Sequence, residues 1–324
     1  MVDVRAPQIA GGLVVPGTDI DDSVWGDRPR GLTAGYTFEQ GSGCARDPMG
    51  SVMSCTGCTI ASQLSRERIN ALVRPVGQGV WVRRFHEVGD ACTRLVCFPH
   101  AGASASYFFR LSAALSPEFN VCAIQYPGRQ DRRSEPFVET IDDLADCIYA
   151  ALNPVIDGPV AFFGHSMGAV VAFEVARRFE ERAQITPTTV FVSARRGPSR
   201  LGDEAIQLGD DADLVKKMCE LGGTDPRLLG NKEMREMVLP AFRNDVCALE
   251  RYTPSPDVRI SAPIVVMTAV DDPSTTMEDA MAWHEHTSGG GTTHTFDGGH
   301  FYLERHAHRV NTVIAETLRG RTPT

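Results

Sequence analysis

The chain has 324 residues, of which 42% are hydrophobic and 23% are charged, as in ordinary globular proteins. This length suits one large domain or two small ones. The formal net charge of −9 argues against a protein dedicated to binding nucleic acid or an anionic membrane surface. No uninterrupted apolar run is long enough to span a bilayer, and the first residues lack the basic and apolar regions of a signal peptide.

Residues 1–79 differ in composition from the rest of the chain. They hold 12 of the 30 glycines and none of the three lysines, and they show no repeating apolar periodicity. We therefore expect a disordered N-terminal extension, followed by a single domain over residues 80–324. Either translation starts later, at Met49 or Met53, or the extension is real and dispensable.

The nine cysteines are scattered, and several lie within apolar runs, where a thiol packs as a small core residue. Without a secretory signal, this usage predicts reduced thiols and a cytoplasmic protein. Cys55 and Cys58 form a CxxC pair, which is a redox pattern or half of a zinc site. Because no second pair follows and the nearest histidine is His86, we interpret the pair as coincidental and expect no metal and no cofactor.

After residue 80, short apolar runs alternate with longer helical patterns. We expect helices over residues 107–115, 141–152, 167–181, 277–286 and 304–318, and strands over residues 94–98, 121–125, 159–163, 189–192, 263–268 and 292–296. Continuous apolar strands separated by helices predict an α/β fold with a mainly parallel sheet, covered by helices on both faces. In such folds the functional residues gather at the carboxyl ends of the strands.

One region interrupts this alternation. Between residues 193 and 263 the pattern is largely helical, over residues 211–221 and 231–252. A helical insertion at the active edge of a sheet is commonly a lid, so we expect a lid over about residues 203–256. The alternative is that these helices only cover the sheet.

Ser166 lies in a Gly-x-Ser-x-Gly motif that joins a predicted strand to a predicted helix of small residues. A sharp strand-to-helix turn presents the serine hydroxyl, and glycines at positions 164 and 168 let the neighbouring backbone approach closely. The N-terminus of the following helix faces the negative charge that develops during attack. The motif therefore predicts an α/β-hydrolase fold in which Ser166 is the nucleophile.

A nucleophilic serine needs a histidine as base and an acid that orients it. Of the nine histidines, His300 is the candidate base, because it lies in a glycine-containing loop directly after the last predicted strand. The acid is expected after the strand at residues 263–268. We choose Asp272, since the following proline fixes the turn, and Asp271 remains the alternative.

Backbone N–H groups of Met167 and Ala101 are the expected donors to the oxyanion, because Met167 directly follows the nucleophile and Ala101 lies in the loop after the first core strand. His100 has two interpretations, as a hydrogen-bonding residue of the loop or as a contact for the substrate.

Five segments together resemble the type II thioesterases, the free-standing α/β-hydrolases that accompany polyketide and nonribosomal peptide synthases. The segments run in the family's order, over residues 99–102, 125–133, 163–168, 239–245 and 298–302. Tyr126-Pro127-Gly128-Arg129 is characteristic of the polyketide branch. The chain departs from the family at Ala103 and Ala269, where the family usually has glycine, and the second departure bears on the choice of acid.

The resemblance implies an editing enzyme that hydrolyses stalled or aberrant acyl groups from the phosphopantetheine arm of acyl carrier proteins of a polyketide synthase. It also implies a monomer. The alternative is an esterase that acts on free small-molecule esters or thioesters. An arginine patch is a candidate surface for the acidic carrier, the alternative being a merely solvated surface; its members are Arg129, Arg132, Arg133, Arg195 and Arg196.

Overall fold

The computed structural model describes residues 80–86, 93–116, 118–200, 210–223, 226–254 and 257–320. The expected N-terminal extension, including the Cys55–Cys58 pair, lies outside the described residues. Within the described part of the chain, none of the helices combines the length and the apolar character needed to cross a membrane.

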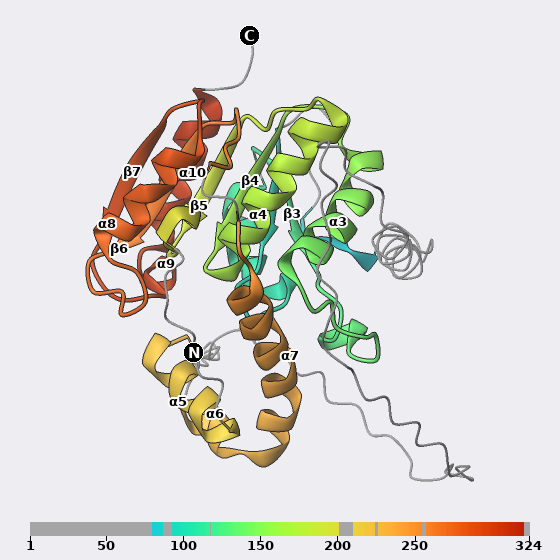
Figure 1. Cartoon of the computed structure of the whole chain (residues 1–324), viewed down its shortest axis with the longest axis vertical. Helices are drawn as coiled ribbons and strands as arrows, with labels where there is room; N and C mark the ends of the chain where they lie inside the picture. The colour runs from blue at the N-terminus through green and yellow to red at the C-terminus, as the bar shows by residue number, and fades with distance from the viewer. Residues whose placement is uncertain are drawn as a thin grey trace, which may run out of the picture. The chain divides into compact units, whose positions relative to one another are not determined.

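The described residues form a seven-stranded sheet in the order β1-β3-β2-β4-β5-β6-β7 (Figure 1). β1 pairs antiparallel with β3, and the other neighbouring strands are parallel. The strands are β1 (Val82–Arg84), β2 (Arg94–Phe98), β3 (Asn120–Ile124), β4 (Val160–His165), β5 (Thr189–Ser193), β6 (Ile264–Ala269) and β7 (Gly291–Phe296).

The central strands are apolar throughout because helices cover both faces of the sheet. β3, β4, β5 and β6 are buried along their whole length. One face packs against α2 (Phe109–Leu115), α9 (Tyr302–Arg305) and α10 (Ala307–Arg319). α3 (Ile141–Leu152) and α4 (Met167–Arg178) lie in front of the sheet in Figure 1, and α8 (Met277–Met281) follows β6. The predicted α/β-hydrolase architecture is confirmed.

Three local features differ from the sequence prediction. β1 was not expected, since it is short and two of its three residues are arginines. The C-terminal helix is interrupted at His306, whose side chain bonds the Asp297 carbonyl instead of continuing a single helix. The helix after Ser166 is α-helical only as far as Arg178 and continues as a π-helix over Phe179–Ala183.

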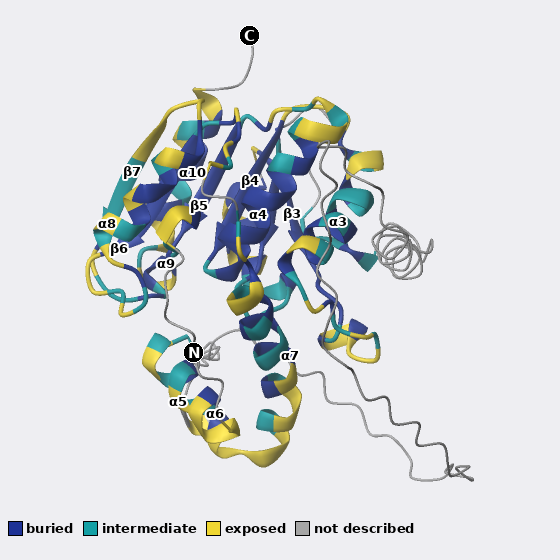
Figure 2. Ribbon diagram, in the orientation of Figure 1, coloured by how far each residue is buried: buried dark blue, intermediate teal, exposed yellow. Residues whose placement is uncertain are grey.

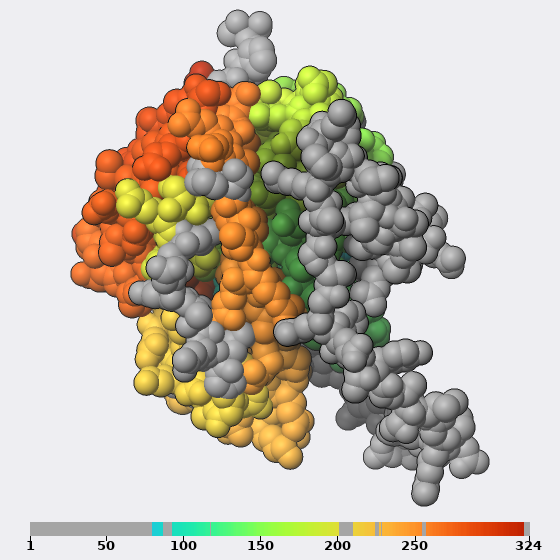
Figure 3. All heavy atoms as spheres, in the orientation of Figure 1, coloured from blue at the N-terminus to red at the C-terminus, as the bar shows by residue number. Residues whose placement is uncertain are grey.

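Three helices form the insertion between β5 and β6: α5 (Asp211–Leu221), α6 (Pro226–Gly230) and α7 (Lys232–Arg251). The side chains of Asp210 and Asn231 cap α5 and α7 by accepting hydrogen bonds from the first free N–H groups. Figure 3 shows the yellow and lighter orange atoms of these helices in the lower part of the view. α6 was not predicted, because five residues are too few to show a helical period.

The two halves of α7 differ in burial (Figure 2). In the outer half, residues 232–238, every residue is exposed or only partly buried. The inner half, residues 239–251, buries Leu239, Phe242 and Asp245, among others. Pro240 lies where the halves meet, and because proline has no N–H it removes one hydrogen bond from the helix there.

Candidate active site

Ser166 sits on the turn between β4 and α4 in a strained conformation, with φ of 55° and ψ of −118°. The two glycines of the motif are required by close packing. A Cβ at Gly164 would lie 2.1 Å from the Gly168 carbonyl oxygen, and a Cβ at Gly168 would lie 1.9 Å from the carbonyl oxygen of Phe98. The turn therefore has room only for glycine on either side of the serine, and it presses against the end of β2.

A hydrogen-bonded chain joins Ser166, His300 and Asp272. His300 Nε2 lies 3.0 Å from Ser166 Oγ, and His300 Nδ1 lies 2.9 Å from Asp272 Oδ2. With Nδ1 protonated, His300 donates to the carboxylate and leaves Nε2 free to accept the serine proton. The structure thus brings together the three residues that the sequence placed in three separate loops.

Asp272 and Asp271 occupy different environments. The Asp272 side chain is fully buried beside His300, whereas Asp271 is exposed and offers its backbone N–H to the Gly298 carbonyl. The geometry therefore favours Asp272 as the partner of the histidine. Burial alone would raise the pKa of Asp272, but the hydrogen bonds from His300 and Ser274 outweigh burial and hold that pKa below its ordinary value.

Ser274 is a member of this network that the sequence prediction missed. Its hydroxyl donates to Asp272 Oδ1 at 2.8 Å, and its oxygen lies 3.0 Å from His300 Nδ1. Its backbone N–H also donates to the same carboxylate oxygen, at 2.9 Å. Both oxygens of Asp272 are therefore engaged, which fixes the orientation of the carboxylate. The Asp-Pro-Ser sequence carries a weak signal for this contact, because an aspartate side chain in a turn commonly accepts the backbone N–H two residues further on.

The two expected oxyanion donors lie at the ends of neighbouring strands. Met167 is the first residue of α4, and Ala101 follows β2 in a turn closed by the Ala103 N–H and the His100 carbonyl, 3.1 Å apart. Within the described residues, neither the Met167 N–H nor the Ala101 N–H has an acceptor inside the protein. Both donors are therefore available to an oxygen atom bound beside Ser166.

Three histidine rings gather beside the serine, but only His300 bonds to it. His165 is turned towards Ser193, with Nδ1 2.9 Å from the hydroxyl oxygen, and Ser193 in turn contacts the Tyr302 hydroxyl at 2.7 Å. Burial lowers the pKa of His165 well below its ordinary value. Burial likewise lowers the pKa of His100 to about 4, so both rings are neutral near pH 7.

His100 is a hydrogen-bonding residue of the loop, and its ring also lines the pocket; contact with substrate stays a prediction. Its Nδ1 lies 3.0 Å from the Ala101 carbonyl oxygen, so the protonated nitrogen donates within the loop. The ring also lines the pocket above Ser166, where it meets the ring of Phe301 edge-on at 4.9 Å between centroids.

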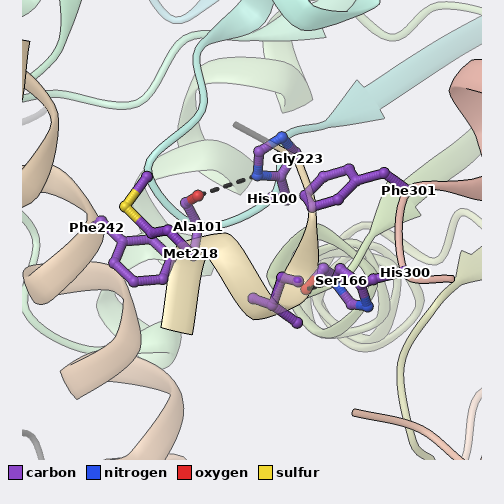
Figure 4. Close-up of a pocket in the computed structure, with 9 residues that line it drawn as sticks. His100, Ala101, Ser166, Met218, Gly223, Phe242, His300 and Phe301 are labelled. Atoms are coloured by element: carbon purple, nitrogen blue, oxygen red, sulfur yellow. Dashed lines mark hydrogen bonds between the residues drawn. The ribbon is translucent and has the colours of Figure 1, made fainter. Parts of the chain in front are cut away.

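The pocket above Ser166 has a volume of about 330 Å³, including its mouth open to solvent. In Figure 4, Ser166 and His300 lie side by side, while Met218 and Phe242 approach from the insertion. The lining is mainly apolar: its members are His100, Ala101, Ser166, Met218, Leu221, Gly223, Phe242, His300 and Phe301. The pocket therefore has a catalytic wall from the sheet edge and an apolar wall from the insertion.

The proposed arginine patch is wrong for two of its members. Arg129 is 6% exposed and pairs with Asp245 through Nη2, at 2.7 Å from either carboxylate oxygen. Arg132 is 3% exposed, pairs with Glu135 and lies over the Trp81 ring. Both guanidinium groups are held inside the protein and are not presented to a partner.

Among the described residues there is no group of three or more histidine, cysteine, aspartate or glutamate side chains that could hold a metal ion. The polar side chains at the site bond instead to one another, in the chain from Ser166 to Ser274. The arrangement can activate a serine hydroxyl, stabilise an oxyanion and accommodate an apolar group, which is the equipment of an acyl-transfer enzyme.

Comparisons with known proteins agree with this chemistry. The family model of the thioesterase domain matches residues 93–320. The probable cadicidin biosynthesis thioesterase of Streptomyces griseus is 47% identical over 238 residues, which are 74% of this chain and 66% of that protein. Thioesterase PikA5 of Streptomyces venezuelae is 42% identical over 244 residues, which are 75% of this chain and 87% of that protein.

A solved structure is similar over the same part of the chain. The type II thioesterase BorB from the borrelidin biosynthetic cluster is 44% identical, with a TM-score of 0.69. The match covers 74% of this chain and 98% of BorB. The similarity therefore extends over nearly the whole of that protein.

Proposed function

The chain belongs to the thioesterase family as a type II thioesterase, an acyl-thioester hydrolase of the serine type, and from this premise we propose its substrate and catalytic residues. The substrates are acyl groups on the phosphopantetheine arm of carrier domains of a polyketide synthase. The catalytic residues are Ser166, His300 and Asp272. The observation that carries the proposal is the hydrogen-bonded chain from Ser166 Oγ through His300 to Asp272, at the floor of an apolar pocket.

In the first half of the reaction, Ser166 Oγ attacks the thioester carbonyl carbon while His300 Nε2 takes the hydroxyl proton. The buried Asp272 carboxylate stabilises the resulting imidazolium. The Met167 and Ala101 N–H groups donate to the oxyanion of the tetrahedral intermediate. The C–S bond then breaks, and His300 returns the proton to the departing thiol of the carrier arm.

In the second half, water attacks the acyl group on Ser166, and His300 takes a proton from this water. A second tetrahedral intermediate forms in the same oxyanion site and collapses to the free acid. The proton returns to Ser166 Oγ, which restores the enzyme. Atoms balance overall, since one water molecule converts the acyl-carrier into a carboxylic acid and a carrier thiol.

The proposal is tested with a carrier protein loaded with a short acyl group and followed by intact-protein mass spectrometry. The wild-type enzyme is expected to remove the acyl mass, and Ser166→Ala is expected to lose at least about 10⁴-fold of this activity, since the nucleophile is absent. Retained turnover by Ser166→Ala would contradict the serine mechanism.

The same assay distinguishes the carrier-directed thioesterase from an esterase of free small molecules. The matched substrates are the acyl-carrier, the same acyl group on free pantetheine, and a nitrophenyl ester of the same acid. A higher kcat/KM on the acyl-carrier than on both small substrates is expected. Equal or higher values on the nitrophenyl ester would favour the esterase.

A further inference from the structure

A buried ion pair that the mechanism does not use lies next to the proposed oxyanion site. Arg129, which follows β3, and Asp245, on the inner half of α7, have side chains only 6% and 4% exposed. Nothing in the hydrolysis steps requires either charge. Burial of two charges is costly unless both are well paired, so the position of this pair calls for an explanation.

The Asp245 carboxylate reaches the turn that carries Ala101. Its Oδ2 accepts the Gly102 N–H at 2.8 Å, while Arg129 Nη2 contacts both carboxylate oxygens at 2.7 Å. Asn244 adds a longer hydrogen bond of 3.3 Å to Oδ1. Arg129 therefore holds the Asp245 carboxylate in place, and the carboxylate in turn holds the backbone N–H of Gly102.

Residues 100–103 form a β-turn, and the central peptide of a β-turn can adopt one of two orientations. Gly102 has φ of 76°, as the third residue of a type II turn requires, and the Ala103 N–H donates to the His100 carbonyl. In the alternative type I turn, the central peptide between Ala101 and Gly102 is rotated by about half a turn.

That central peptide is held at both ends. Its carbonyl, from Ala101, accepts a hydrogen bond from His100 Nδ1 at 3.0 Å, which Figure 4 shows as a dashed line. Its N–H, from Gly102, donates to Asp245. The Ala101 N–H, one peptide earlier, has no such partner and remains the donor available to substrate.

α7 also covers the turn sterically. A Cβ at Gly102 would lie 3.2 Å from Phe242 Cβ, and Phe242 stands one turn before Asp245 on the same face of α7. The inner half of α7 therefore contacts the turn through an apolar side chain and a charged one.

We propose that Asp245 is a positioning residue for catalysis: its carboxylate, fixed by Arg129, holds the Ala101–Gly102 peptide so that the Ala101 N–H is aimed at the oxyanion. This inference rests on the proposed function, because it assigns Asp245 to the oxyanion site of that reaction. It makes the inner half of α7 part of the catalytic machinery and not only a cover over the pocket.

The chain offers a matched control in a second buried carboxylate–guanidinium pair. Glu174 and Arg178 on α4 are each 3% exposed, and Glu174 accepts a hydrogen bond from the Tyr252 hydroxyl directly after α7. This pair also ties the end of α7 to the sheet domain, but it has no hydrogen bond to the turn at residues 100–103. Asp245→Asn and Glu174→Gln therefore each remove one buried negative charge that pairs with an arginine, although Glu174 also pairs with Arg177 and Arg178 also pairs with Asp142 and Asp146.

The experiment compares the full-length wild type, Asp245→Asn and Glu174→Gln. It measures kcat and KM for an acyl-pantetheine thioester and the rate at which a fluorophosphonate labels Ser166. Both variants are expected to unfold at lower urea concentration. Only Asp245→Asn is expected to lower kcat and the labelling rate, by about 10- to 100-fold, as part of the 10²–10³-fold that loss of one oxyanion donor costs. Its KM should stay within about twofold of the wild type.

Rates for Asp245→Asn within about twofold of Glu174→Gln, under conditions where both are folded, would overturn the proposal. If Asp245→Asn does not fold, Arg129→Lys replaces it, since lysine keeps the charge but its side chain is one bond too short to place its nitrogen where Arg129 Nη2 contacts both oxygens. This variant is expected to lower kcat by about 3- to 10-fold at unchanged KM and to speed amide hydrogen exchange at Gly102. Unchanged kcat and exchange would overturn the proposal.

Fluorophosphonate labelling distinguishes failure of the proposed function from failure of the positioning role of Asp245. If the fluorophosphonate does not label Ser166 in the wild type, the proposed function itself is wrong. If the wild type is labelled and Asp245→Asn is labelled at the same rate, only the positioning role of Asp245 is wrong.

Discussion

The sheet edge and the helical insertion form opposite walls of one pocket, but they are built differently. On the sheet edge, Ser166, His300 and Asp272 are joined by hydrogen bonds of 2.9–3.0 Å, and Ser166 and Asp272 follow the fully buried strands β4 and β6. The insertion packs through an apolar cluster of its own: its members are Leu214, Met218, Leu229, Leu239, Phe242 and Val246. Its outer surface carries exposed ion pairs such as Lys232–Glu236, which contribute little to stability.

The two walls of the pocket are suited to different tasks: one positions the reacting atoms, and the other accommodates the acyl group. Reacting atoms must be held to within fractions of an ångström, which directional hydrogen bonds in a buried network can do. An apolar wall that includes a flexible methionine such as Met218 can accommodate groups of varied shape, because its contacts are not directional. The inner half of α7 belongs to both walls, since it carries Phe242 into the pocket and Asp245 to the turn. The two tasks thus meet within the inner half of α7, at Phe242 and Asp245.

The largest difference between neighbouring residues is expected on the sheet edge, at the adjacent aspartates. Asp272→Asn should lower kcat/KM by about 10³- to 10⁴-fold, because the amide cannot stabilise the His300 imidazolium and favours the wrong tautomer. Asp271→Asn, on the exposed neighbour, should stay within about threefold of the wild type. Steady-state kinetics on one acyl thioester compares the two. A larger loss for Asp271→Asn would mean that the observed hydrogen bond to Asp272 is not the functional one.

A smaller but clear difference is expected between the two halves of α7. Phe242→Ala removes a side chain that is 4% exposed and should lower the free energy of unfolding by about 3–5 kcal/mol. Met237→Ala, at a position that is 60% exposed, should change it by less than about 0.5 kcal/mol. Urea unfolding followed by circular dichroism measures both. Equal losses would show that the outer half is as firmly packed as the inner half.

The smallest effect concerns pH and the His100 loop. Because burial lowers the pKa of His100 to about 4 from 6.5, the unfolded chain binds more protons than the folded one between these values. The free energy of unfolding should therefore fall as pH falls from about 6.5 towards about 4, with a contribution from this residue of at most about 1.4 kcal/mol per pH unit. Above about pH 6.5 His100 is neutral in both states, so it no longer makes the free energy of unfolding depend on pH.

His100→Asn should remove this part of the pH dependence, because asparagine does not titrate. Its amide can still donate to the Ala101 carbonyl, so activity near pH 7 should be better preserved than in His100→Ala. The measurement is urea unfolding at pH 7 and pH 5 together with kcat at pH 7. If the pH dependence were the same in His100→Asn as in the wild type, the pKa of His100 would not be lowered in the folded protein.

Much of the fold could be predicted because the central strands are continuous apolar runs. A strand covered on both faces, such as Val160–His165, has almost no polar residue, and this pattern is hard to mistake. β1 could not be predicted, since two of its residues are arginines and its pairing with β3 is set by tertiary context. α7 was predicted through Pro240 because the apolar period on either side outweighs one missing hydrogen bond.

The site could be predicted only as far as local motifs extend. Ser166 and His300 stand in sequence contexts that prescribe a strand-to-helix turn and a loop after the last strand. The choice of Asp272 over Asp271 rested only on the following proline, because the sequence does not show which of two adjacent side chains in the turn after β6 faces the histidine. Asp245 could not be predicted at all, since its partner Arg129 lies 116 positions away in the chain.

The central claim is that Ser166 carries the acyl group between thioester cleavage and release of the acid. The most direct measurement mixes the full-length enzyme with an acyl-carrier, quenches the reaction in acid within milliseconds to seconds, and maps the peptides by mass spectrometry. We predict a transient mass increase equal to the acyl group on the peptide that contains Ser166, and none in Ser166→Ala. Release of free acid at the wild-type rate by Ser166→Ala, or an acyl group found on a different residue, would contradict the account.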